Sequence, residues 1–71
     1  MHFQAKPNHK FIKQIHSSKK NSVEEDHSLY FDTFKKEYFV VESTEYESGP
    51  NVTNSYIVRP IETSEAKTLE N

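Results

Sequence analysis

The chain has 71 residues, no cysteine and a formal net charge of −2. A chain of this length forms one small domain that buries only ~60% of its unfolded surface, and no disulfide is available to stabilise it. Lysines near the N-terminus interrupt any signal-peptide core, and no apolar stretch approaches the ~20 residues of a membrane span, so we expect a cytoplasmic protein with no membrane partner.

Charge is distributed unevenly along the sequence. Residues 1–20 carry five lysines and no acid, whereas residues 21–33 carry four acids and no base. A basic segment ahead of an acidic body indicates either a polyanionic partner or a segment that pairs with its own body. Eight of the nine basic side chains are lysine, a bias that favours a bacterial or phage genome rich in A and T.

The first predicted element is a helix over residues 9–20, preceded by a short leader, residues 1–7, that is able to add a third strand to a sheet. Asn8 is a suitable N-cap for this helix. Lysines recur at helical intervals on one side, which is typical of a basic amphipathic helix. The apolar residues on the other side are Phe11, Ile12 and Ile15.

The second predicted element is a helix over residues 23–36. Ser22 and Glu25 match a capping box, and the acids at the start and the lysines at the end complement the helix dipole. One face of this helix would hold Val23, His27, Tyr30, Phe31 and Phe34. Because Leu29-Tyr30-Phe31 is also typical of a strand, an alternative interpretation places a strand over residues 28–34.

The third predicted element is a β-hairpin. Residues 37–47 and 52–59 are rich in β-branched and aromatic side chains, and they flank a turn cluster, residues 48–51, that contains the only glycine. An exposed edge of such a hairpin is able to pair with a partner strand or with a second copy of itself. Residues 62–71 are mostly polar and are predicted to be a disordered tail, which leaves residues 1–61 as the domain.

These elements predict an α+β fold in which two short helices pack on an antiparallel hairpin. The predicted core consists of Phe11, Ile15, Tyr30, Phe34, Phe39, Val41, Tyr56 and Val58.

The hairpin and the segment before it carry a family resemblance. Lys36-Glu37-Tyr38-Phe39-Val40-Val41-Glu42, a polar turn with Gly49, and Thr53-Asn54-Ser55-Tyr56-Ile57-Val58 resemble the end of a winged helix-turn-helix domain. The resemblance implies that residues 23–36 are a recognition helix and residues 37–59 a wing. The acids at the start of that helix would leave the phosphate contacts to the lysines of the first helix.

The sequence predicts no enzyme, cofactor or metal site. It has no cysteine nucleophile and no serine in a glycine-flanked elbow, and a single glycine cannot build a phosphate-binding loop. His2, His9 and His16 are spaced seven residues apart, which on a helix is ~10.5 Å and too far for two rings to bind one ion.

Two binding functions follow from these patterns. The first is a small regulator that binds DNA, because lysines on one face neutralise phosphates. Its predicted contacts are Lys6, Lys10, Lys13, Lys19, Lys20 and Arg59.

The alternative is a modulator or inhibitor, of phage or plasmid type, that docks on a host protein. Its acids would meet a basic groove, and its tyrosines would anchor the contact. Its predicted contacts are Glu24, Glu25, Asp26, Tyr30, Glu42, Glu45 and Tyr46.

Overall fold

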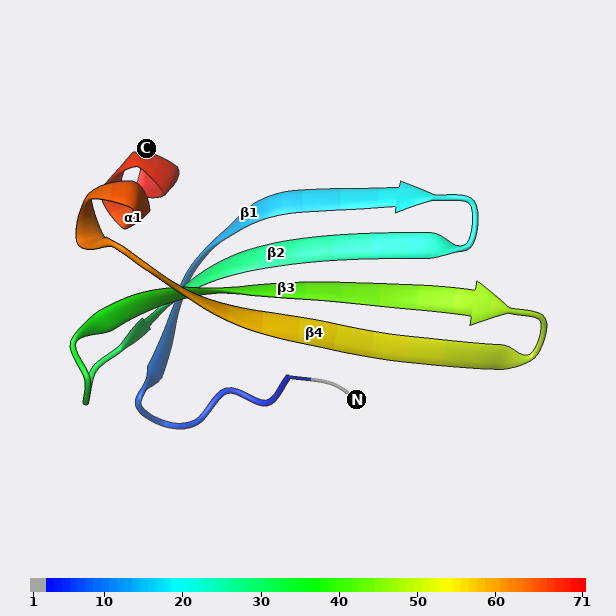
Figure 1. Ribbon diagram of the computed structural model, residues 1–71, viewed down its shortest axis with the longest axis horizontal. Coiled ribbons are helices and arrows are strands. Elements are labelled where there is room, and N and C mark those ends of the chain that lie inside the picture. The colour runs from blue at the N-terminus through cyan, green and yellow to red at the C-terminus, as the bar shows by residue number, and fades with distance from the viewer. Residues whose placement is uncertain (1–2) are drawn as a thin grey trace.

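Four long strands form one antiparallel sheet in the computed structural model, which describes residues 3–71 (Figure 1). Neighbours in the sheet are also neighbours in the chain, so β1 and β4 are its two edges. The described residues contain one helix, α1, which follows β4. The elements are β1 (His9–Lys20), β2 (Val23–Asp32), β3 (Glu37–Ser48), β4 (Asn51–Ile61) and α1 (Thr63–Glu70).

The sheet is long and thin. The molecule measures 41 × 24 × 14 Å, and a strand of 12 residues at ~3.3 Å per residue accounts for the longest of these lengths. Figure 1 shows α1 at one end of the sheet and the β1–β2 and β3–β4 turns at the other, which we call the open end. The helix therefore covers only part of one face.

A two-residue turn fixes the register of β3 and β4. Gly49 supplies the positive φ of 61° that this turn requires, and Ser48 lies opposite Asn51. The residues that flank a two-residue turn form a hydrogen-bonded pair, and such pairs alternate along an antiparallel ladder. The odd-numbered residues of β4 therefore direct their backbone groups toward β3, and the even-numbered residues direct theirs outward.

The face of the sheet on which α1 lies, which we call the helix face, holds the main core. Leu29, Val40 and Ala66 of α1 are all 0% exposed and pack together. The side chains that surround this cluster are Ile12, Ile15, Tyr38, Ile61 and Leu69. The ammonium group of Lys67 also lies 5.7 Å from the centre of the Tyr38 ring, a cation–π contact that helps to hold α1 on the sheet.

Two irregularities in β1 bring Ile12 and Ile15 to this core. The pairing of β1 with β2 shifts once between Phe11 and Lys13 and again between Gln14 and His16. Side chains alternate between the two faces of a sheet, so two residues three apart in a regular strand lie on opposite faces. A β-bulge adds one residue to the strand and interrupts this alternation, so two such residues can lie on the same face. Ile12 and Ile15 are the added residues, and both pack against the core.

The opposite face of the sheet, the leader face, is covered near α1 by the N-terminal leader. The ring of Phe3 lies 5.3 Å from that of Tyr30, 6.2 Å from that of Phe39 and 5.7 Å from that of Tyr56. Tyr30 and Phe39 also stack, with ring centres 5.3 Å apart. Offset and edge-on ring contacts of this kind stabilise the packing beyond the apolar area that they bury. Phe3 therefore packs the leader against this face of the sheet.

The prediction of two helices and of a winged-helix fold is wrong. Residues 9–20 form β1, and β2 and a turn occupy residues 23–36, so the structure has neither a helix-turn-helix nor a recognition helix. The alternative strand interpretation of residues 28–34 was the better one, because β2 continues to Asp32. The hairpin was predicted correctly, since β3 pairs with β4 across the turn at Gly49.

The predicted core was correct only in part. Phe39 and Val41 are buried, but the Phe34 side chain is 83% exposed because it lies in the β2–β3 turn. Leu29 and Val40, the two large residues that are fully buried, were not in the predicted set. Residues 62–71, predicted as a disordered tail, contain α1, whose Ala66 is fully buried. No helix in the described part of the chain is long and apolar enough to cross a membrane.

Shortening a core valine tests how much this small core contributes. We expect Val40→Ala to lower the free energy of unfolding by about 2–3 kcal/mol, because the change removes buried apolar surface and leaves a cavity. The matched control is Val52→Ala, since Val52 is 52% exposed and should lose under about 0.5 kcal/mol. Urea unfolding measured by circular dichroism checks both values, and equal losses would contradict this description of the core.

Candidate functional site

A hollow of about 410 Å³ lies on the leader face, between Phe3 and the open end of the sheet. Its lining comes from the leader and from all four strands, so residues far apart in the sequence meet there. The lining includes Gln14, Glu24, Asp26, Tyr30, Val41 and Glu45. The hollow therefore combines an aromatic and apolar wall with several carboxylates.

Two carboxylates of this hollow face each other across neighbouring strands. Glu24 of β2 lies directly opposite Glu45 of β3 in the ladder. Like charges directly opposite each other destabilise a sheet. Neither carboxylate has a hydrogen-bond or ion-pair partner among the described residues. The sheet therefore holds two negative charges side by side, with Lys19 of β1 opposite Glu24 on its other side.

A third carboxylate, that of Asp26, is held in place by its neighbours. The Gln14 amide donates a hydrogen bond to Asp26 Oδ1, and the Ser28 hydroxyl lies 3.4 Å from Oδ2. Asp26 lies two residues from Glu24 on the same strand, so both side chains point to the leader face. The three carboxylates thus form one acidic group, and only Asp26 is oriented by hydrogen bonds within the described residues.

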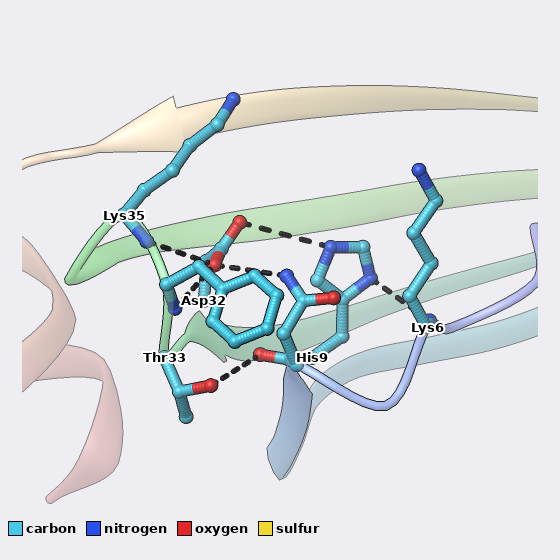
Figure 2. A network of polar contacts seen from close by, with 7 residues as sticks. Lys6, His9, Asp32, Thr33 and Lys35 are labelled. Carbon is cyan, nitrogen blue, oxygen red and sulfur yellow. Dashed lines mark hydrogen bonds and ion pairs between the residues drawn. The ribbon is translucent and has the colours of Figure 1, made fainter.

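Asp32 fixes the end of the leader, the segment whose Phe3 lines the hollow (Figure 2). Its Oδ1 accepts hydrogen bonds from the Asn8 side chain at 3.0 Å and from the backbone N–H groups of Phe34 and Lys35 at 2.9 and 3.1 Å. The imidazole Nε2 of His9 lies 3.8 Å from Oδ2. Asp32 therefore connects the β2–β3 turn to the segment where the leader enters β1.

These contacts also change the acidity of Asp32. The N–H of Lys35, the Asn8 amide, the N–H of Phe34 and the charge of His9 all favour the carboxylate, and together they outweigh the desolvation that opposes it. The pKa of Asp32 is therefore lowered from its usual value.

The structure divides the residues predicted for protein binding between the two faces. Glu24, Asp26, Tyr30 and Glu45 all line the hollow. The other three alternate with them along the strands and point to the helix face. These three residues are Glu25, Glu42 and Tyr46.

Four of the six basic residues predicted for DNA binding, those of β1 apart from Lys19, and Arg59 of β4, lie on the helix face, and the other two lie elsewhere. Within β1, Lys10, Lys13 and Lys20 pair with residues of the helix face, whereas Lys19 pairs with Glu24 on the leader face. Arg59 is engaged in ion pairs, at 3.5 Å from Glu42 and 4.0 Å from Glu65. Lys6 lies in the leader, four residues before Lys10.

The histidines lie closer together than the sequence suggested. His16 and His27 are paired across β1 and β2, with ring centres 4.8 Å apart, and Glu25 Oε2 lies 3.8 Å from His16 Nε2. His2, the first of the three histidines spaced seven residues apart, lies outside the described residues. Within residues 3–71 no group of three or more histidine and carboxylate side chains is arranged to hold a metal ion.

Sequence reasoning missed Gln14, Ser28, Val41 and Phe3 as neighbours of the acidic group. Helix geometry assigned Gln14 and Asp26 to separate helices, so their contact could not be inferred. One signal was present, since Glu24, Asp26, Ser28 and Tyr30 occupy alternate positions that share one side of a strand.

Comparisons with known proteins give no match: no protein-family model fits the sequence, and no curated protein or solved structure matches it significantly. The function must therefore be argued from the geometry of the hollow and the sheet.

The pH dependence of unfolding tests the role of Asp32. A carboxylate whose pKa is lowered by folding stabilises the protein above its unfolded pKa, and this stability is lost as the pH falls through its folded pKa. We expect the free energy of unfolding of wild type to decrease as the pH falls below about 4. We expect Asp32→Asn to have a lower free energy of unfolding than wild type at neutral pH, and a smaller decrease below about pH 4. Thermal melts between about pH 2 and 7 check this, with Glu47→Gln as the control, and parallel curves for wild type and Asp32→Asn would contradict it.

Proposed function

We propose that this protein is a non-enzymatic binding protein whose leader face receives a basic segment of a partner protein. The observation that carries the proposal is the placement of Glu24 opposite Glu45 in the hollow, with Asp26 beside them. A lysine or arginine side chain placed between these carboxylates would relieve a repulsion that the free protein retains.

The rest of the hollow suits a basic peptide. Tyr30 and Val41 provide a wall for the aliphatic part of a lysine or arginine side chain, and the Tyr30 ring is able to stack with a guanidinium group. Asp26 is already oriented by Gln14 and Ser28, so less conformational entropy is lost when a donor binds it.

The charge arrangement favours a protein partner over DNA. One lysine of β1, Lys19, lies directly opposite an acid, Glu24 of β2, at the strand spacing of ~4.8 Å. The other three lysines of β1 lie opposite apolar residues of β2. The acidic group of the hollow would repel phosphates. A cytoplasmic setting, which the cysteine-free sequence favours, and a host protein as the partner of a phage or plasmid protein remain parts of this proposal.

Binding to a basic peptide tests the proposal. We expect a labelled peptide of alternating arginine and glycine to bind, and the double variant Glu24→Gln, Glu45→Gln to weaken its binding at least about tenfold, because the charge-assisted contacts are lost. Fluorescence anisotropy at about 50 and 200 mM salt measures this affinity and its salt dependence.

The control variant is Glu37→Gln, which removes one negative charge at the far end of β3 and should leave the affinity unchanged. A glutamate–glycine peptide and mixed-sequence duplex DNA serve as control ligands. Tight binding of DNA, or equal binding of the peptide by the double variant, would refute the proposal.

The repulsion itself is open to a separate test. We expect Glu45→Gln to raise the free energy of unfolding by a few tenths of a kcal/mol, because it removes one of two like charges that face each other. The gain should shrink at about 1 M salt, where the charges are screened. Differential scanning calorimetry measures it, and a loss of stability at low salt would show that the two carboxylates do not repel each other in the folded protein.

A further inference from the structure

Two histidines face each other across neighbouring strands on the helix face of the sheet. His16 of β1 is paired with His27 of β2, and the ring centres are 4.8 Å apart. His27 lies two residues before Leu29 of the core, so both side chains point to the same face. The His16 side chain is 46% exposed. Each neutral imidazole has one nitrogen lone pair that can bind a metal ion, so the pair offers two such nitrogens where solvent reaches them.

The distance between the two rings matches the distance that a shared metal ion requires. Zinc–nitrogen bonds are ~2.0–2.1 Å long, so the centre of a liganding imidazole lies ~3.2 Å from the ion. Two such centres are ~4.5 Å apart when the ligands are at a right angle and ~5.2 Å apart at the tetrahedral angle. The observed 4.8 Å lies between these values. Rotation of an imidazole about χ2 costs little, so each ring can turn one nitrogen toward a common point.

Carboxylates lie on both sides of the histidine pair. Glu25 Oε2 is 3.8 Å from His16 Nε2. Glu42 of β3 lies directly opposite His27, and its carboxylate is 3.5 Å from Arg59. Among the described residues, the ion-pair neighbour of Glu25 is His16 alone. A metal cation held by the two imidazoles would therefore lie close to a carboxylate whose charge favours it and that no lysine or arginine engages.

Two protein ligands leave open positions on the ion. Within residues 3–71 no third histidine or carboxylate joins the pair in an arrangement that holds a metal ion. Zinc takes four ligands in most protein sites, and water fills the positions that the protein leaves open. Imidazole suits zinc, copper and nickel, whereas magnesium and calcium prefer oxygen ligands. The ligand class that fits this pair is therefore a divalent transition-metal ion that exchanges with solvent.

We propose that His16 and His27 form an exchangeable binding site for a divalent transition-metal ion such as zinc, and that the bound ion links β1 to β2. An ion held by one side chain from each strand stabilises the folded sheet, because the unfolded chain does not keep the two imidazoles at this separation. This inference does not rest on the proposed peptide binding, since the acidic hollow lies on the leader face.

Thermal unfolding in the presence of zinc tests the site. We expect about 1 mM zinc chloride at neutral pH to raise the melting temperature of wild type by at least about 4 °C, because an ion that binds the folded state stabilises it. His16→Gln and His27→Gln should each reduce this rise to under about 1 °C, since one imidazole alone does not link the strands. Circular dichroism measures each melt against that of the same variant without metal. His9→Gln and His2→Gln are the matched controls, which remove an imidazole elsewhere in the sequence and should keep the full rise.

Nuclear magnetic resonance of the imidazole nitrogens identifies the ligands directly. Zinc should change the ring signals of His16 and His27 and leave those of His9 unchanged. Both nitrogens of His9 are engaged, because Nδ1 accepts a hydrogen bond from the Lys6 N–H and Nε2 faces Asp32. Magnesium chloride at the same concentration should affect neither the ring signals nor the melting temperature. Ring signals of His16 and His27 that zinc leaves unchanged would overturn the proposal, as would an equal rise in melting temperature for wild type and the His16→Gln and His27→Gln variants, or an equal rise with magnesium.

Discussion

The shortage of large apolar side chains is the constraint on which the rest of this structure depends. Leu29 and Val40 are the two large side chains that are fully buried in the described part of the chain. A chain with so few large apolar side chains cannot cover both faces of the sheet of a molecule 41 Å long. It covers one end, with Ala66 of α1 on one face and Phe3 of the leader on the other. The open end is left as a thin polar sheet, and the acidic hollow forms where this cover stops.

The difference between local signals and strand pairing explains which parts of the fold the sequence predicts. The hairpin of β3 and β4 was predictable because its signals are local: β-rich runs on both sides of a turn that contains glycine. β1 was not, because its two bulges place Ile12 and Ile15 on one side at a spacing of three, which a helix also produces. At the start of β2, Ser22 and Glu25 satisfy a capping box by composition, but pairing with β1 and β3 on both sides outweighs that local preference.

The candidate site shows the same division between local and long-range information. The sequence grouped the acids of residues 24–26 with Tyr30 and Glu45 by residue type alone, and the structure places Glu24, Asp26, Tyr30 and Glu45 around one hollow. Which of them share a surface depends on strand alternation and on the register of β2 with β3, and neither follows from a helical interpretation. The basic and acidic segments of the sequence also lie next to each other in the structure, because the basic β1 pairs with the acidic β2.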